Sequence, residues 1–108
     1  MTLESRLKKL VMLFPGQGSQ SVGMLNDVFA ESAAARQALE EADEALGFAL
    51  SAVIQDGPAE QLDTTEFTQP AMLAADVAVY RAWRALGGPA PDWVAGHSLG
   101  EYAALVVA

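Results

Sequence analysis

The chain has 108 residues, 52% hydrophobic and 19% charged, values typical of one small globular domain and not of a disordered chain. Its net charge of −8 excludes nucleic acid as the main partner, because a phosphate backbone needs a basic protein face. The absence of cysteine and the single histidine exclude a disulfide framework, a thiolate nucleophile and a metal site of cysteines or several histidines, so we expect no metal and no cofactor.

The first ten residues carry charge and are not followed by an apolar run of signal-peptide length. Nowhere does the sequence reach the roughly 18 consecutive apolar residues that a membrane span needs. We therefore expect a cytoplasmic protein without a membrane partner.

A short apolar run, Leu10–Phe14, is the first predicted element, and Pro15 and Gly16 close it. A continuous apolar run bounded in this way is typical of a strand that is buried on both faces in a parallel sheet. The glycine-rich segment Gly16–Gln20 follows as a loop.

Helical spacing of apolar residues dominates the rest of the chain. Met72, Val79, Trp83 and Leu86 share one stripe, which predicts a long helix packed on a sheet. The elements expected after the first loop are a short helix near Leu25–Phe29, a helix over Ala33–Leu46, a short helix after Pro58, a helix over Thr68–Leu86, a loop over Gly87–Pro91, a second buried strand over Trp93–Ala95, and a helix from Leu99 onward.

This order of strand, helices, strand and helix predicts an α/β fold, a parallel sheet with flanking helices. We find no repeat and no linker, so residues 1–108 are interpreted as part of one domain. The sequence ends inside an apolar helical pattern, which indicates an incomplete core.

The segment Gly96–Gly100 fits the G-x-S-x-G pattern of a nucleophile elbow, a sharp turn from strand to helix with the serine at its tip. Side chains at the two flanking glycines would clash in so tight a turn. Ser98 is therefore the candidate nucleophile, and the backbone N–H of Leu99 can donate to the oxyanion of a tetrahedral intermediate. The alternative is a structural glycine turn with a capping serine.

His97 lies beside the candidate nucleophile, but neighbouring side chains on an extended segment point to opposite faces. A general base must reach the serine oxygen, which this residue is poorly placed to do. We interpret His97 as a packed or hydrogen-bonded residue of the turn.

Three segments resemble the malonyl-CoA:acyl-carrier-protein transacylases. They are Ala95–Leu105 around the serine, Phe14–Gln20 near the N-terminus, and the weaker Gln69–Ala71. The resemblance implies the hydrolase-like large domain of an acyltransferase. It also implies a two-step transfer, in which Ser98 takes malonyl from coenzyme A and passes it to the phosphopantetheine thiol of acyl carrier protein.

The same resemblance implies that the backbone N–H groups of Gln17 and Leu99 form the oxyanion hole, and that Gln17 and Gln69 contact substrate. Glycines at 16 and 18 would let the backbone of Gln17 approach the substrate. A phosphate-binding turn is the alternative for this loop, but the Lys-Ser/Thr ending of a P-loop is missing.

The family's chain is about three times longer, and its catalytic histidine and its arginine for the substrate carboxylate lie downstream of the serine. We therefore interpret residues 1–108 as the N-terminal part of the hydrolase-like domain, without the smaller ferredoxin-like subdomain. We expect it to be inactive by itself. An acyltransferase domain of a polyketide synthase, a serine esterase and a non-catalytic fragment remain as alternatives.

Overall fold

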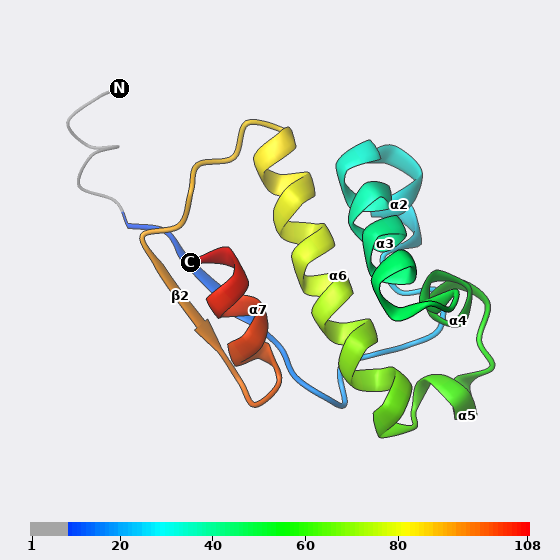
Figure 1. Cartoon of the computed structure of the whole chain (residues 1–108). Helices are drawn as coiled ribbons and strands as arrows, with labels where there is room; N and C mark the ends of the chain where they lie inside the picture. Colours follow the sequence, from blue (N-terminus) through cyan, green and yellow to red (C-terminus); the bar gives the residue numbers. More distant parts are fainter. Residues whose placement is uncertain (1–8) are drawn as a thin grey trace.

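The computed structural model describes residues 9–108, which form two strands and six helices (Figure 1). In chain order these elements are β1 (Val11–Phe14), α2 (Asn26–Glu31), α3 (Ala33–Leu46), α4 (Leu50–Asp56), α5 (Ala59–Leu62), α6 (Thr65–Ala85), β2 (Trp93–Gly96) and α7 (Gly100–Val107). Within these residues no helix is long and apolar enough to cross a membrane.

The two strands pair in parallel, with Val11 opposite Trp93 and Phe14 opposite Gly96. The helices between the strands form the long crossover that a parallel pair requires. The expected fold class, an α/β fold with a parallel sheet and flanking helices, is confirmed, and the sheet of the described residues has two strands.

One face of the sheet packs against α7, where Phe14 is buried with Ala103 and Ala104. The opposite face is exposed, with 75% of Leu13 and 69% of Trp93 accessible to solvent. The prediction that both strands are buried on both faces was therefore wrong for these residues. Their composition suits two-sided burial, but within the described part of the chain helices cover only one side.

A second core lies among the helices. Phe29, Leu39 and Ile54 are buried there against the alanine-rich face of α6. Figure 1 shows α6 between this helical cluster and the unit formed by the strands and α7. The helix thus contributes to both cores, since its Leu73 also packs near Phe14.

The expected apolar stripe on α6 does not form its buried face. Val79, Trp83 and Leu86 are exposed, whereas the buried residues are mostly small. The buried residues of α6 are Thr68, Ala71, Met72, Ala74, Ala75, Asp76, Ala78 and Ala82. Small side chains let α3 and α7 pack closely on either side, so α6 packs mainly on helices and not on the sheet.

Helix α6 also begins earlier than its expected start at Thr68. It starts at Thr65, which places Pro70 inside the helix, where it cannot donate to the carbonyl of Glu66. The hydroxyl of Thr68 donates to the carbonyl of Leu62, tying the beginning of α6 to the end of α5. Helix α4 was not expected at all, while α3 has the predicted bounds.

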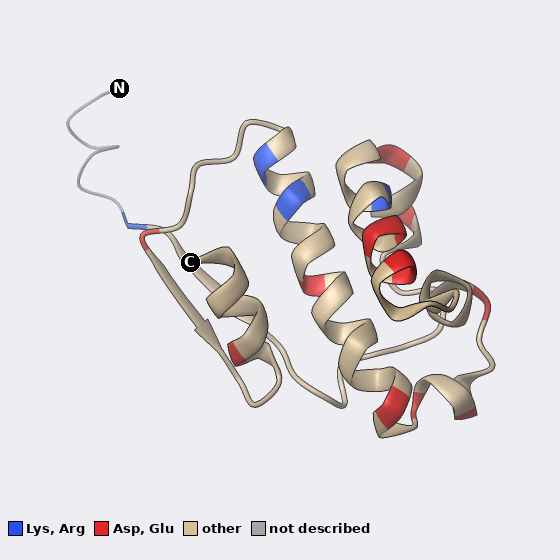
Figure 2. Ribbon diagram, viewed as in Figure 1, with Lys and Arg blue, Asp and Glu red and all other residues tan. Residues whose placement is uncertain are grey.

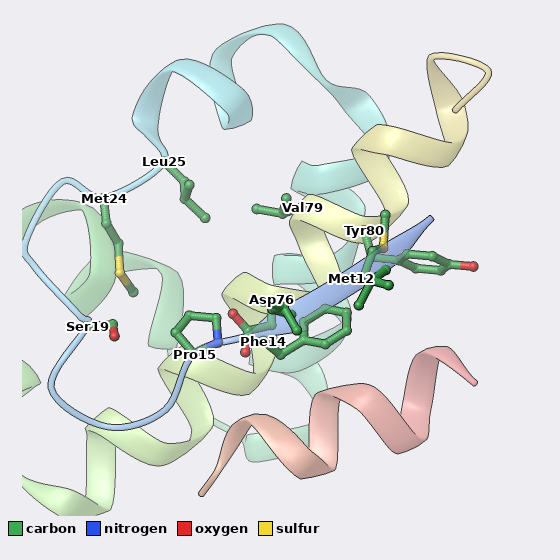
Figure 3. Close-up of a pocket in the computed structure, with 11 residues that line it drawn as sticks. Met12, Phe14, Pro15, Ser19, Met24, Leu25, Asp76, Val79 and Tyr80 are labelled. Atoms are coloured by element: carbon green, nitrogen blue, oxygen red, sulfur yellow. The ribbon is translucent and has the colours of Figure 1, made fainter. Parts of the chain in front are cut away.

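One buried side chain is charged in its usual state. Asp76 is 8% exposed and faces a cavity of about 480 Å³ beside β1, together with Pro15, Ser19 and Tyr80 (Figure 3). Among residues 9–108 no donor is hydrogen-bonded to its carboxylate. Desolvation by burial raises the pKa of Asp76 from 3.8 to about 6.

This pKa gives Asp76 a predictable effect on stability. Because the folded chain holds the proton more tightly than the unfolded chain, the contribution is favourable at low pH and is lost as pH rises through about 6. The Asp76→Asn substitution removes this titration. The change that it causes in the free energy of unfolding should therefore be about 2–3 kcal/mol more favourable at pH 8 than at pH 4. Urea denaturation at the two pH values measures the difference.

The matched control for this measurement is Asp27→Asn, at an exposed position in the first turn of α2. It should change stability by a few tenths of a kcal/mol at either pH. A pH dependence of Asp76→Asn equal to that of the wild-type chain would show that burial does not perturb this carboxyl.

Candidate active site

Ser98 lies at the tip of the turn between β2 and α7. The strand ends at Gly96 and the helix begins at Gly100, so the strand and the helix expected around the serine are both present. Ser98 is exposed and has φ of 55°, a left-handed backbone conformation that is uncommon outside glycine. Hydrogen bonds from Gly100 N–H to the His97 carbonyl (3.0 Å) and from Glu101 N–H to the Ser98 carbonyl (3.1 Å) close the turn. Such strain persists only where surrounding contacts enforce it.

Backbone contacts at the two glycines enforce this turn. A side chain at Gly96 would overlap the backbone of Gly100, and a side chain at Gly100 would overlap the carbonyl of Phe14. The expectation that side chains would clash at both positions is confirmed.

The Gly16–Gln20 loop lies directly against the serine turn. Gly16 is buried, and a Cβ atom there would be 2.5 Å from the His97 carbonyl oxygen and 3.4 Å from the backbone nitrogen of Leu99. Within residues 9–108 the N–H groups of Gln17 and Leu99 donate to no protein acceptor. Each of the two segments thus carries one free donor at or next to this contact.

A cleft of about 440 Å³ lies at the carboxyl ends of both strands, next to this contact. It is lined by Leu13, Phe14, Pro15, Ala95, Gly96 and His97. The carboxyl end of a parallel sheet is the usual place for ligands in α/β proteins.

Side chains of the loop reach the connection between α5 and α6. Gln17 Nε2 donates to Thr65 Oγ1 at 3.3 Å, and Gln20 Nε2 donates to Asp63 Oδ1 at 3.0 Å. The bonded residues are 48 and 43 positions apart in the sequence. No local pattern could have identified Asp63 or Thr65, because only the fold brings them to the loop.

Two of the residues considered in the sequence analysis, His97 and Gln69, make no side-chain hydrogen bond with the serine or the loop among the described residues. The ring of His97 is exposed and makes no hydrogen bond within the described residues, so the interpretation of a packed or hydrogen-bonded ring was wrong. Its backbone N–H donates to the Phe14 carbonyl at 3.0 Å. Gln69 is exposed in the second turn of α6, and among residues 9–108 no hydrogen bond joins it to Gln17 or Ser98.

Positive charge lies away from the serine turn. Figure 2 shows the basic residues of α6 near its C-terminal end, while the turn lies at the other end of the strands. Arg81 is paired with Glu41, and Arg84 Nη1 donates to the Gly88 carbonyl at 3.0 Å. In the described part of the chain no group of three or more acidic, histidine or cysteine residues could hold a metal ion.

Comparison with known proteins relates this geometry to one family. The acyl transferase domain family matches residues 11–108. A malonyl CoA-acyl carrier protein transacylase of Escherichia coli (strain K12) is 53% identical over 102 residues, which are 94% of this chain and 33% of that protein. The chain thus spans about a third of the length of the curated relatives it matches.

Solved structures agree. The crystal structure of an acyl carrier protein S-malonyltransferase from Vibrio cholerae has a TM-score of 0.90 and 54% identity, covering 94% of this chain and 33% of that chain. A malonyl-transacylase in complex with its type II PKS acyl-carrier protein has a TM-score of 0.89 and 51% identity, with the same coverage.

The contact between Gly100 and Phe14 can be tested by substitution. Gly100→Ala should destabilise the chain by about 3 kcal/mol, since backbone atoms cannot yield as side chains do. The control is Gly47→Ala at the end of α3, where φ is 77° and nothing lies within 4 Å of an added Cβ. That change should cost about 1–2 kcal/mol from backbone strain alone. Urea denaturation compares them; equal losses would contradict the close contact.

Proposed function

The chain belongs to the acyl transferase domain family, and from this premise we propose that Ser98 carries malonyl groups from coenzyme A to acyl carrier protein. The Ser98 oxygen attacks the thioester carbonyl of malonyl-CoA, the carbon–sulfur bond breaks, and coenzyme A leaves as its thiol. The phosphopantetheine thiol of acyl carrier protein then attacks the seryl ester and restores the serine hydroxyl.

The observation that carries the proposal is the strained serine turn in contact with the Gly16–Gln20 loop. Each tetrahedral intermediate places negative charge on the former carbonyl oxygen. We assign its stabilisation to the N–H groups of Gln17 and Leu99, which have no protein acceptor among the described residues. One such donor is worth roughly 10²–10³ in rate. The turn would then act as a nucleophile elbow.

Gln69 is proposed as a further substrate contact. Its support is its exposed position near the beginning of α6, the helix whose first residue is bonded to Gln17. An amide there could donate to a carbonyl or carboxylate oxygen of the acyl group.

The proposed reaction also needs a base to deprotonate Ser98 and a cation to bind the malonyl carboxylate. Among residues 9–108 neither group is positioned at Ser98 for these roles. The ring of His97 is not hydrogen-bonded to the serine, and Arg81 and Arg84 make contacts elsewhere. We infer that the catalytic histidine and the arginine for the malonyl carboxylate belong to the family's downstream sequence. In this proposal the chain corresponds to the N-terminal part of the hydrolase-like domain. We propose that it acts in the cytoplasm, and its lack of cysteine fits that reducing environment.

We propose a second acceptor of the malonyl group besides the carrier protein of fatty-acid synthesis. The malonyl-transacylase that is 51% identical was solved with a type II PKS acyl-carrier protein. A polyketide carrier protein presents the same phosphopantetheine thiol. The proposed transfer therefore includes both types of carrier protein as acceptors.

The test joins this chain to the remaining two thirds of the Escherichia coli relative and measures malonyl transfer from malonyl-CoA to carrier proteins of both types. We expect transfer by the joined protein and little or none by the chain alone. Ser98→Ala should lower the rate at least about a thousandfold, because the acyl acceptor is gone. Mass spectrometry should find the malonyl ester on Ser98.

Ser21→Ala is the matched control, because it is the same substitution at an exposed serine that directly follows the Gly16–Gln20 loop. Ser21 plays no part in the proposed chemistry. It should transfer at the wild-type rate. Retention of more than a tenth of the activity by Ser98→Ala would refute the assignment. Faster hydrolysis of a simple ester than malonyl transfer would favour an esterase.

A further inference from the structure

The side-chain amide of Gln20 joins the Gly16–Gln20 loop to the body of the protein. Its Oε1 atom accepts the N–H of Gly18 at 2.8 Å, and its Nε2 atom donates to Asp63 Oδ1 at 3.0 Å. Both ends of one planar amide are thus engaged. The reverse orientation would turn two attractive contacts into repulsive ones, so the network fixes which way the amide points.

Packing alone does not hold this loop. Gln17 and Gly18 are exposed, Gly18 has φ of 107°, and nothing lies within 4 Å of a Cβ atom built on it. Within the loop itself the one backbone bond among the described residues runs from Ser19 N–H to the Gly16 carbonyl, at 3.3 Å. A glycine-rich segment with so few contacts needs an outside support to keep one conformation.

The support is the connection between α5 and α6, which is itself firmly placed. Leu62 is 1% exposed and Thr68 is fully buried, and a hydrogen bond joins them across the connection. Between them, Asp63 accepts from Gln20, while Thr65 accepts from Gln17. Two side chains of the loop are therefore tied to neighbouring residues of one rigid segment.

We propose that Gln20, anchored on Asp63, is a positioning residue that holds the backbone N–H of Gln17 at the oxyanion position. The inference rests on the proposed function, since it assumes that this N–H stabilises the oxyanion. Gln20 touches no reacting atom in this role. It acts through Gly18, whose amide follows the carbonyl of Gln17. A donor fixed in advance needs no reorganisation when charge develops on the acyl oxygen.

The first experiment uses this chain as it is and does not depend on the reaction. Water exchange of the Gly18 amide, measured by ¹⁵N NMR, should be about tenfold faster in Gln20→Ala and in Asp63→Ala, because each removes one part of the support. Asp63→Asn keeps an oxygen that can accept from Nε2 and should exchange like wild type. Gln20→Glu should fail like Gln20→Ala, since its carboxylate would face that of Asp63.

Gln37→Ala is the matched control, the same substitution at an exposed position of α3 without a side-chain hydrogen bond among residues 9–108. The Gly47 amide, bonded to the Asp43 carbonyl at 2.9 Å, serves as an internal reference that no variant should change. A Gly18 exchange rate unchanged in Gln20→Ala, with Gly47 also unchanged, would overturn the proposal.

The second experiment asks whether the support matters for catalysis, using the joined protein described above. Gln20→Ala should lower kcat about tenfold and leave KM for malonyl-CoA within about twofold, because the donor acts mainly on the charged intermediate. Asp63→Asn should restore the wild-type kcat that Asp63→Ala loses.

The two proposals fail in different ways. Absence of transfer by the wild-type joined protein would count against the proposed function, while the exchange measurement would still decide whether Gln20 holds the loop. Normal transfer with a wild-type kcat in Gln20→Ala would overturn the positioning role alone.

Discussion

The carbonyl group of Phe14 fixes the arrangement on which the rest of the site depends. It accepts the N–H of His97 at 3.0 Å, which extends the parallel pairing one residue beyond the strands. It also leaves no room for a side chain at Gly100, the first residue of α7. The chain must therefore turn sharply between these two residues, and Ser98 is left in a left-handed conformation at the tip. The next residues after Phe14 are the loop itself, so one backbone group sets both halves of the site.

Helix α6 connects this backbone arrangement to the larger helical core. Its alanine face packs on α3 on one side, and its Leu73 reaches the smaller cluster around Phe14 on the other. Its first residue, Thr65, is bonded to Gln17. The same helix thus supports the serine turn through α7 and the loop through its N-terminal end. Burial of the helical core consequently determines where the candidate oxyanion donors lie relative to each other.

The exposed sheet face has a physical meaning for the family. Val11, Leu13 and Trp93 are apolar, as strands buried on both faces require, yet all three are more than half exposed in this chain. The curated relatives are about three times as long as the chain. Apolar side chains on both faces of a strand suit a parallel sheet that is covered on both sides. The cavity beside β1 has the buried carboxyl of Asp76 at its wall and is lined by β1 residues of both sheet faces, among them Leu13 and Phe14.

The sequence by itself determined the features that depend on neighbouring residues. The α/β class, the bounds of α3 and the turn at Ser98 all follow from local apolar spacing, a helix-ending Gly47 and the two glycines around the serine. The resemblance of three short segments predicted the family that the comparisons then showed. Periodicity could not reveal which stripe of α6 is buried, because alanine and larger apolar residues alternate around that helix and packing space decides between them. The early start of α6, the exposure of His97, the burial of Asp76 and the bonds from the loop to Asp63 and Thr65 were decided by tertiary structure alone. They depend on residues that are distant in the chain and meet only once the helices pack.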